Sequence, residues 1–375
     1  MYDMKIAFFC GSLARGGSER VSLELAKYFL HEKAITTSII TIRYDNNEYE
    51  LPDGIQRFSL SDSKNVNTYF EKLSFPKKIV KLRKIINQEK IDCMIVMGVP
   101  FCIYCIPACF GININLIVSE RNDPTHFSGK TIVKICSRNL MKYADGFVFQ
   151  TQDAFNFYSK VAHEKAVVIP NPVFTNENCI VGDKGNGQYF VNVGRLIEQK
   201  NQKLLIDAFS IIAKRFADYQ LYIIGEGKLK ESLQEKISFL GLDKRILLLG
   251  AKKTEELLFI IRNSRGFILS SNFEGVPNAL IEAMSLGIPC ISTDCPCGGP
   301  KSLIETGKNG VLVTVGDCLS LSNAMEFLIQ NPKQASMMGK EAEKIKQLLS
   351  IEVIGRRWFE FIDYIYKFKE NKSNA

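Results

Sequence analysis

Residues 271–284 hold two glutamates, Glu274 and Glu282, on either side of the sequence Gly-Val-Pro-Asn-Ala. Pro277 suits the first position of a helix, where Gly275 and the first helical amides would face an anion. If fully helical, eight residues would span roughly 12 Å, which is wider than the roughly 5–9.5 Å between the carboxylates of a glycosidase. The pair therefore fits the two ends of one long ligand better than a hydrolytic site. The alternative for Glu282 is a solvated glutamate on a helix surface.

Two further loops contain residue types that bind phosphate. One follows an apolar run and carries Arg195 and Lys200; an arginine fork and a lysine point charge together suit a diphosphate. The other follows the first apolar run and contains Gly16 and Gly17, which let a ligand approach the backbone at a helix N-terminus. It matches neither the dinucleotide fingerprint nor a P-loop. The alternatives are two solvated surface cations and a tight strand-to-helix turn.

Short apolar runs alternate with helical patterns twice along the chain, which predicts two parallel sheets covered on both faces. We predict strands at residues 6–10, 35–42, 93–97, 114–119, 146–150, 189–193, 220–224, 245–249, 266–270, 289–292 and 311–313. We predict helices at residues 18–31, 75–88, 130–143, 153–160, 202–216, 228–240, 254–262, 278–286 and 319–329. The expected fold class is α/β, with two doubly wound Rossmann-like domains whose ligands bind at the carboxyl ends of the strands.

The domain boundaries follow from composition along the chain. Its 375 residues suit two domains, at roughly 100–200 residues each. Residues 1–170 form the expected N-terminal domain, and residues 189–350 form the C-terminal domain. Residues 171–188, rich in Asn, Gly, Pro and charge, are predicted to be a linker. The end of the chain, residues 351–375, is predicted to be a helix that packs back on the N-terminal domain.

The overall charge and the cysteines exclude several classes of protein. The 48 Lys and Arg exceed the 40 Asp and Glu by only eight, so we expect no nucleic-acid partner, which would need a denser basic stripe. Most of the cysteines lie in apolar stretches, among them Cys93 and Cys136. Their spacings do not suit zinc, and the chain starts without a signal peptide, so we expect buried thiols in a cytoplasmic protein.

Residues 93–119 contain no Asp, Glu, Lys or Arg, which raises the question of a transmembrane helix. Gly, Pro and Asn interrupt this run, so we predict a buried strand, helix and strand instead. Immediately upstream, six Lys and Arg occur between Lys77 and Lys90, opposed only by Glu89. Each cation near an anionic bilayer contributes about 1 kcal/mol, so this stretch is a candidate for peripheral contact with the inner face of the plasma membrane. The alternative is a solvated helix face.

Taken together, these residues resemble the GT-B-fold glycosyltransferases of family 4, which are retaining enzymes with two Rossmann-like domains facing across a cleft. In the second domain the resemblance rests, in order, on Val193-Gly194-Arg195, Gln199-Lys200-Asn201, Ile224-Gly225-Glu226-Gly227, Glu274 through Glu282, Thr293-Asp294-Cys295-Pro296 and Gly299-Pro300. In the first domain, Gly16-Gly17-Ser18-Glu19-Arg20 and Ser119-Glu120-Arg121-Asn122-Asp123-Pro124 look like the branch that builds bacterial O-antigens, capsules and lipid-linked oligosaccharides.

The resemblance implies a role for each matching residue in binding a nucleotide sugar. Arg195 and Lys200 would bind the diphosphate, Glu274 would lie at the donor sugar, and Glu282 would bind the ribose hydroxyls. The remaining implied donor contacts are Gly16 and Gly17 over the diphosphate, Gly275, Val276, Asn278 and Ala279 at the sugar and phosphate, and Gly250 and Lys252 beside the base, expected to be uracil.

The acceptor side departs from the family pattern, because many members carry a histidine where this chain has Glu120 and its neighbours. His126 is the candidate catalytic histidine, the alternative being a solvated loop residue; Glu120 would otherwise serve the acceptor hydroxyl, beside Arg121 and Asn122. The implied donor is a UDP-hexose or UDP-N-acetylhexosamine, and the implied acceptor is an oligosaccharide that we expect to be linked to polyprenyl diphosphate. No Asp-x-Asp occurs, so no metal cofactor is expected. A non-hydrolysing UDP-sugar epimerase of the same fold is the alternative.

Overall fold

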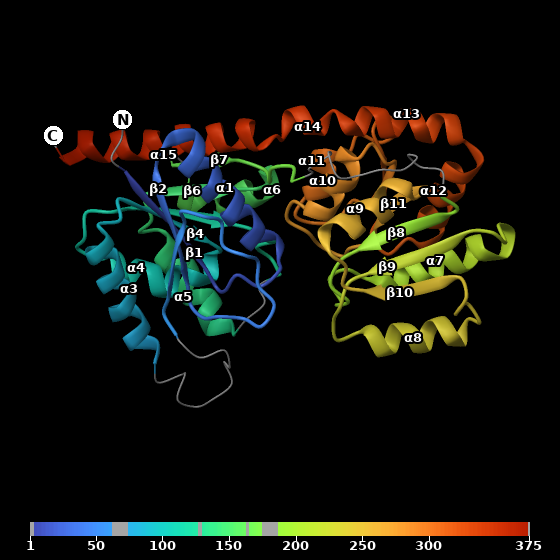
Figure 1. The fold of residues 1–375 in the computed structure, drawn as a ribbon, viewed down its shortest axis with the longest axis horizontal. Helices are drawn as coiled ribbons and strands as arrows, with labels where there is room; N and C mark the ends of the chain where they lie inside the picture. Colours follow the sequence, from blue (N-terminus) through green and yellow to red (C-terminus); the bar gives the residue numbers. More distant parts are fainter. Residues whose placement is uncertain (1–3, 62–73, 127–129, 163–164, 175–186, 374–375) are drawn as a thin grey trace. The chain divides into compact units, whose positions relative to one another are not determined.

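The computed structural model describes residues 4–61, 74–126, 130–162, 165–174 and 187–373. The chain divides into two compact units, one comprising Met1–Pro172 with Ile351–Ala375 and the other Val173–Ser350 (Figure 1). The C-terminal helix thus belongs to the unit in which the chain begins. Most of the segment predicted as a linker, residues 175–186, lies outside the described residues.

The first unit is built on a seven-stranded parallel sheet with the order β3-β2-β1-β4-β5-β6-β7. Its strands are β1 (Lys5–Cys10), β2 (Thr36–Thr41), β3 (Gln56–Ser59), β4 (Cys93–Met97), β5 (Asn115–Glu120), β6 (Gly146–Phe149) and β7 (Ala166–Val168). Its helices are α1 (Gly17–Lys33), α3 (Phe75–Glu89), the 3-10 turn η1 (Val99–Phe101), α4 (Cys102–Cys109), α5 (Thr131–Met141), α6 (Gln152–Ala162) and α15 (Ile351–Ser373). The central strands are continuously apolar because both faces of the sheet are covered.

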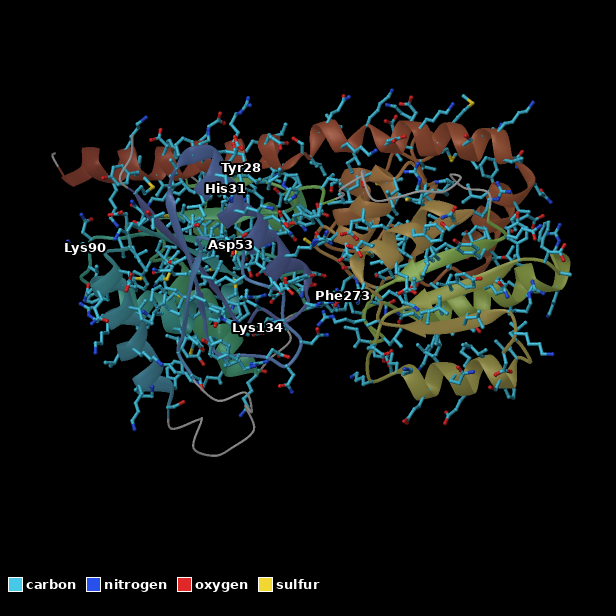
Figure 2. The ribbon with its side chains drawn as sticks, viewed as in Figure 1. Tyr28, His31, Asp53, Lys90, Lys134 and Phe273 are labelled. Carbon is cyan, nitrogen blue, oxygen red and sulfur yellow. The ribbon has the colours of Figure 1, made fainter. Side chains whose placement is uncertain are left out.

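Helices α1 and α15 cover one face of this sheet, and α3, α4 and α5 lie on the other (Figure 1). Tyr28, labelled in Figure 2, lies where α1 meets α15, and a Cβ on Gly355 would lie 2.4 Å from its ring. The helix α15 also reaches β6, because a Cβ on Gly146 would lie 2.9 Å from Ile365. Trp358, the only tryptophan, lies on α15 and is fully buried.

The second unit contains a six-stranded parallel sheet with the order β10-β9-β8-β11-β12-β13. Its strands are β8 (Tyr189–Val193), β9 (Gln220–Ile224), β10 (Ile246–Gly250), β11 (Gly266–Leu269), β12 (Cys290–Thr293) and β13 (Val311–Val313). Its helices are α7 (Gln202–Arg215), α8 (Lys230–Phe239), α9 (Thr254–Asn263), α10 (Asn278–Ser285), α11 (Gly299–Leu303), α12 (Cys318–Gln330), α13 (Pro332–Glu343) and α14 (Ile345–Leu348). The strand order reverses between β8 and β11, which is where such sheets bind ligands.

The predicted α/β architecture of two doubly wound parallel sheets is confirmed. The uncharged run of residues 93–119 forms β4, η1, α4 and β5, and β4 pairs in parallel with β5. None of the helices in the described ranges is both long and apolar enough to cross a membrane. The prediction omitted the edge strands β3 and β7 and the helices α11, α13 and α14. The two strands were missed because each has few fully buried side chains.

One expectation about the cysteines is wrong. Cys136 is exposed, because it lies on the outward stripe of α5, four residues after Ile132, whose side chain is 68% exposed. The cysteines on β1 and β4 and those on α4 are buried as predicted, among them Cys93 and Cys105. Burial raises the pKa of the Cys105 thiol well above its usual value, so this thiol stays protonated.

Candidate functional site

The loops that follow β8 and β11 are neighbours at the reversal of strand order in the second unit. Lys200 comes from the first loop and Glu274 from the second, and Lys200 Nζ lies 2.5 Å from Glu274 Oε1. Ser271 Oγ donates to the same oxygen at 2.6 Å, and Gln199 Nε2 lies 3.4 Å from Glu274 Oε2. Only 15% of the Lys200 and 7% of the Glu274 side-chain surface is exposed. The structure thus brings together two residues predicted to share one site.

Two asparagines fix the backbone around Lys200. Asn201 has a left-handed φ of 45°, and its side chain caps α7 by accepting from the amide of Leu204. The Asn201 side-chain amide donates to Asn272 Oδ1 at 2.9 Å. The backbone N–H of Asn272 donates to the backbone carbonyl of Gln199 at 2.8 Å. The two loops are therefore joined on both sides of Lys200, so the ammonium projects from a fixed backbone.

Glycines in the motifs allow the loops to pack backbone against backbone. A Cβ on Gly225 would lie 2.0 Å from the Gly194 carbonyl oxygen, and a Cβ on Gly299 would lie 1.6 Å from the Gly275 carbonyl oxygen. Gly225 also has a φ of +143°, which side-chain-bearing residues rarely adopt. The loop that carries Arg195 therefore rests directly on the loop after β9. The Arg195 side chain is left exposed at this edge of the sheet.

Helix α10 begins at Asn278, so Pro277 caps the helix and is not its first residue as predicted; its ψ of 113° is extended, not helical. Phe273, labelled in Figure 2, lies in the loop that leads into this helix. The predicted backbone contacts lie together here: Gly275 and Val276 are buried before the helix, and Asn278 and Ala279 are half-buried at its start. Glu282, one turn further, is 4% exposed. The alternative of a solvated Glu282 is therefore wrong.

The residues predicted to flank a base lie at the end of β10. The Gly225 amide donates to the Gly250 carbonyl at 2.9 Å, so Gly250 lies at the same edge of the sheet as the loop that carries Arg195 and Lys200. Gly250 has a left-handed φ of 67°. Lys252 Nζ lies 2.7 Å from Glu256 Oε1 in a partly exposed ion pair. The Lys252 charge is therefore neutralised by a neighbour one turn away.

In the first unit, Gly16 ends the connection between β1 and α1, and Gly17 is the first residue of α1. Gly16 caps α1 with an extended backbone, and a Cβ on it would lie 2.5 Å from Glu19 Oε2. The same oxygen accepts a hydrogen bond of 2.8 Å from Ser18 Oγ. A carboxylate at this position is favoured by the helix dipole. The Glu19 carboxylate therefore lies at the turn where a ligand phosphate was predicted.

Glu120 is the last residue of β5 and is only 7% exposed. Its Oε1 accepts the amides of Arg121 and Asn122 at 2.9 and 3.2 Å, and its Oε2 accepts the Tyr158 hydroxyl at 3.2 Å. Burial raises its pKa to about 7, against the opposing effect of these hydrogen bonds and of the Arg138 charge. Near neutral pH this carboxyl group therefore both accepts and donates protons.

Two other predicted acceptor-side residues have internal partners. The Arg121 guanidinium donates to the Asn171 side chain and lies 3.4 Å from Ser119 Oγ. Burial lowers the pKa of Arg121 to about 10, so it remains cationic at neutral pH. His126 Nδ1 lies 2.8 Å from Asp123 Oδ2, and 49% of its side chain is exposed. Among the residues that the structure describes, no cluster of three or more His, Cys, Asp or Glu is placed to hold a metal ion.

Sequence comparison identifies the family. The model of group 1 glycosyl transferases matches residues 176–345, and the model of glycosyltransferase family 4 matches residues 15–177. Together these matches run through both units. The chain is a glycosyltransferase of family 4. The predicted family is therefore confirmed, and the motifs described above belong to a transferase.

Three relatives and one solved structure agree with this assignment. An uncharacterized glycosyltransferase of Methanocaldococcus jannaschii is 31% identical over 66% of each chain. A GalNAc-alpha-(1->4)-GalNAc-alpha-(1->3)-diNAcBac-PP-undecaprenol alpha-1,4-N-acetyl-D-galactosaminyltransferase of Campylobacter jejuni is 25% identical over 96% of this chain and 98% of its own. An Escherichia coli UDP-Gal:alpha-D-GlcNAc-diphosphoundecaprenol alpha-1,3-galactosyltransferase is 33% identical over 43% of this chain and 41% of its own. The sucrose-phosphate synthase of Thermosynechococcus elongatus shares the GT-B fold, with a TM-score of 0.83, 16% identity, and coverage of 97% and 99%.

Four residues of this glycosyltransferase that act on the site residues were not predicted from the sequence. Ser271 and Gln199 lie within the motifs, and a hydroxyl three residues before Glu274 was the only signal for Ser271. Tyr158 contacts Glu120 from 38 positions away along the chain. No spacing rule relates such positions, because only the packing of α6 on the sheet brings this tyrosine to the end of β5. The fourth residue, Arg138, reaches the same carboxylate through its charge, from α5.

The raised pKa of Glu120 predicts a pH-dependent stability of the glycosyltransferase. A carboxyl whose pKa rises from 4.5 to about 7 on folding holds its proton more tightly in the folded state. Its favourable contribution is complete below pH 4.5 and is lost as the pH rises towards about 7, which amounts to about 3 kcal/mol. In the Glu120→Gln variant this loss should be absent. Urea unfolding of both proteins between pH 4.5 and 8, followed by Trp358 fluorescence, measures the difference in the first unit.

The quantity to compare is the difference in unfolding free energy between the variant and the wild type at each pH. A constant offset reflects altered hydrogen bonds and is not informative. The difference should change by about 3 kcal/mol in favour of the variant between pH 4.5 and 7. Parallel profiles over this range would show that Glu120 titrates at an ordinary pKa.

Proposed function

We propose that this glycosyltransferase moves a hexose or an N-acetylhexosamine from a UDP-linked donor to a polyprenyl-diphosphate-linked glycan, with retention, in bacterial surface polysaccharide assembly. The observation that carries the proposal is the buried Lys200–Glu274 pair at the reversal of strand order in the second sheet. The names of the C. jejuni and E. coli relatives, which specify undecaprenol-linked acceptors and UDP-galactose, support the same substrate classes.

The proposed chemistry breaks the bond between sugar C1 and the nucleotide diphosphate. Negative charge then develops on the leaving phosphate, so cations and helix amides aimed at it stabilise the transition state more than the ground state. Arg195 at the exposed edge, Lys200 beside it and the first-turn amides of α10 are the groups for this role. They supply the positive charge that a metal ion supplies in other transferases, so no metal is part of the proposal.

Glu274 takes a different part in the proposed reaction. Its carboxylate lies against Lys200 and accepts from Ser271, so its negative charge and its orientation are both fixed. A fixed carboxylate near the donor sugar stabilises the positive charge that develops on the ring as the bond to phosphate breaks. Glu282, buried within α10, would accept from the ribose hydroxyls. In this proposal the sugar of the donor lies at Glu274, before α10, and the ribose lies at Glu282, within α10.

On the acceptor side, we assign the hydroxyl proton to Glu120. Its pKa of about 7 lies where a general base works best at neutral pH. His126 is the second candidate, but its ring is half exposed and its Nδ1 is paired with Asp123. Residues 127–129, which follow it, lie outside the described residues. The Glu120 carboxylate is therefore the better-positioned group.

The donor and acceptor are tested by measuring UDP release from a panel of UDP-sugars, with and without a polyprenyl-diphosphate-linked glycan. We expect rapid release with one UDP-hexose or UDP-N-acetylhexosamine, only in the presence of acceptor, and an unchanged rate in EDTA. Nuclear magnetic resonance of the product should show the anomeric configuration of the donor. Conversion of a UDP-sugar to its epimer without acceptor would replace this proposal with the epimerase. Inversion at C1 would contradict retention.

We further propose that α3 contacts an anionic membrane surface. Lys77, Lys81 and Lys84 are exposed, and their spacing of four and three residues places them on one face of the helix. Two other cations of the stretch serve elsewhere: Arg83 donates to the carbonyls at the end of α4, and Lys78 is buried. The surface available to a bilayer is therefore smaller than the six charges of the sequence indicate.

Vesicle sedimentation tests this contact. Replacing Lys77, Lys81 and Lys84 with glutamine should weaken binding to phosphatidylglycerol vesicles by on the order of 10²-fold, since each cation contributes about 1 kcal/mol. The matched control replaces three exposed lysines of the second unit, Lys228, Lys244 and Lys253, with glutamine, which lowers the net charge equally and should leave binding unchanged. Equal sedimentation of the wild type with anionic and neutral vesicles would remove the membrane role.

A further inference from the structure

Tyr158 is a buried residue of α6 whose hydroxyl reaches the end of β5 from a distant part of the chain. Only 5% of its surface is exposed. Helix α6 packs on β6 and β7 (Figure 1), and the Tyr158 hydroxyl donates to Glu120 Oε2 at 3.2 Å. In the proposed reaction Glu120 receives the proton of the acceptor, so a partner of this carboxylate acts on the reaction through it.

The ring of Tyr158 is held by aromatic neighbours. Phe149 on β6 is the strand partner of Glu120, so the two side chains lie on the same face of the sheet. The rings of Phe149 and Tyr158 stack with centroids 5.5 Å apart and planes 13° apart, and Phe157 lies edge-on to Tyr158 at 5.0 Å. Stacked and edge-on contacts of this kind favour one ring orientation. The hydroxyl is therefore directed at Glu120 by packing as well as by its hydrogen bond.

The two oxygens of the Glu120 carboxylate have different partners. Each oxygen of an ionised carboxylate has two acceptor sites, and the backbone amides of Arg121 and Asn122 occupy both sites of Oε1. Among the residues that the structure describes, Oε2 accepts from the Tyr158 hydroxyl alone. One acceptor site of Oε2 is therefore left for the hydroxyl of the sugar acceptor.

Charged and titratable groups act on Glu120 from several elements. They are Arg121 directly after β5, Arg138 on α5, Tyr158 on α6 and the Cys102 thiol on α4. Burial raises the pKa of Tyr158, and the neighbouring Glu120 charge raises it further. The Tyr158 hydroxyl therefore keeps its proton at neutral pH and acts as a donor, which favours the ionised form of Glu120.

We infer that Tyr158 is a positioning residue, whose hydroxyl holds Glu120 Oε2 in place to receive the proton of the sugar acceptor. The inference rests on the proposed function, which assigns that proton to Glu120. As the acceptor oxygen bonds to C1 of the donor sugar, the bond from C1 to the diphosphate breaks, and its electron pair leaves with UDP. The acceptor hydroxyl proton moves to Oε2 and passes to water after the product dissociates. Tyr158 keeps its own proton throughout and acts only through Glu120.

The variant Tyr158→Phe tests this inference, because it removes the hydroxyl and keeps the stacked ring. The readout is the pH dependence of kcat/KM for UDP release with the best donor and acceptor. In the wild type, kcat/KM should rise with pH through an inflection at about 7, where Glu120 ionises. Loss of a donor to the carboxylate should move this inflection up by about one pH unit. At about pH 9.5, kcat/KM of the variant should still be on the order of tenfold lower, because the ionised oxygen is no longer held in place.

The matched control is Tyr189→Phe in the second unit. The Tyr189 hydroxyl donates to the Ile260 carbonyl at 2.8 Å, so this variant also loses one tyrosine hydrogen bond. Tyr189 is the first residue of β8, at the end of the strand opposite to the loop that carries Lys200. The inflection and the plateau of Tyr189→Phe should equal those of the wild type. The same result for Tyr158→Phe would overturn the inference.

Infrared spectroscopy without substrates separates this inference from the proposed function. The difference spectrum between the wild type and Glu120→Gln isolates the C=O band of the protonated Glu120 carboxyl, and its pH dependence gives the Glu120 pKa. Between Tyr158→Phe and Tyr158→Phe/Glu120→Gln, this band should titrate about one pH unit higher. A band that does not move would overturn the inference alone. A band that moves while kcat/KM does not follow it would contradict the proposed role of Glu120, and the inference would fall with it.

Discussion

Replacing Arg195 with alanine should lower the turnover number for sugar transfer by about 10²–10³-fold and leave the fold intact. The reason is that Arg195 would donate to the diphosphate oxygens, where negative charge develops as the sugar leaves. Removing one donor to such a charge raises the barrier by about 2.7–4 kcal/mol. The fold should survive because the side chain is exposed, and the Arg195 carbonyl, which accepts from Gln202, is unaffected. Steady-state UDP release with the best donor and acceptor measures the effect.

The matched control for Arg195 is Lys214→Ala. Lys214 is exposed near the other end of α7, roughly 18 Å along the helix from its start at 1.5 Å per residue. Its removal changes the net charge by the same amount, so it separates a local effect from a general loss of positive charge. Turnover of Lys214→Ala should equal that of the wild type. Near-normal turnover of the Arg195→Ala protein would contradict the assignment of the diphosphate site.

The sequence predicted the central strands well because a strand buried on both faces must be continuously apolar. Tyr189–Val193 and Gln220–Ile224 occur at the predicted residues for this reason. The edge strands do not have this constraint. Gln56–Ser59, for example, buries only Ser59, so its side chains carry little information about its place beside β2. Such an edge strand is defined by its pairing with the neighbouring strand, and this pairing depends on the tertiary fold.

The candidate site could be predicted only where its members are close in sequence or belong to a recurring motif. Lys200 and Glu274 were found because each lies in such a motif, and their contact followed from the order of strands. The Tyr158 hydroxyl that reaches Glu120 could not be found, because nothing local to α6 marks it. The pKa of Glu120 likewise depends on burial by several elements. The protonation of Glu120 near neutral pH therefore depends on tertiary packing, which the local sequence does not indicate.

Glu274→Gln should lower the turnover number for sugar transfer strongly, and it should also destabilise the second unit. The two effects have different causes. Loss of the carboxylate charge removes stabilisation of the donor sugar, at a cost of about 10²–10³-fold in turnover. Loss of its charge also leaves the Lys200 ammonium, whose side chain is 15% exposed, without its ion-pair partner. Breaking a buried pair in this way costs about 3 kcal/mol, at the low end of the range because Lys200 retains some contact with water.

A second substitution separates the catalytic role from the structural one. In Lys200→Met/Glu274→Gln both charges are absent, and methionine keeps the packing of the lysine stem against Gly194, where a Cβ would lie 3.2 Å from Lys200 Cδ. The unfolding free energy should return to within about 1 kcal/mol of the wild type, while turnover stays at least about 10²-fold below that of the wild type. Urea unfolding followed by circular dichroism reports this, since Trp358 fluorescence reports the first unit only.

The exposed pair of Glu226 and Lys230 gives the matched control for this cycle. Its atoms lie 3.1 Å apart, but about half of each side chain is exposed, so Glu226→Gln, Lys230→Met and the double variant should each change stability by about 0.5 kcal/mol or less. If Glu274→Gln were no less stable than Glu226→Gln, the Lys200–Glu274 pair would not be a buried ion pair. If the double variant at the site recovered turnover together with stability, the charges would serve the fold alone. Recovery of stability without recovery of turnover is the result that assigns both residues to the chemistry. In that case the neutral pair of the double variant replaces the charged pair in the fold but does not replace it in the reaction.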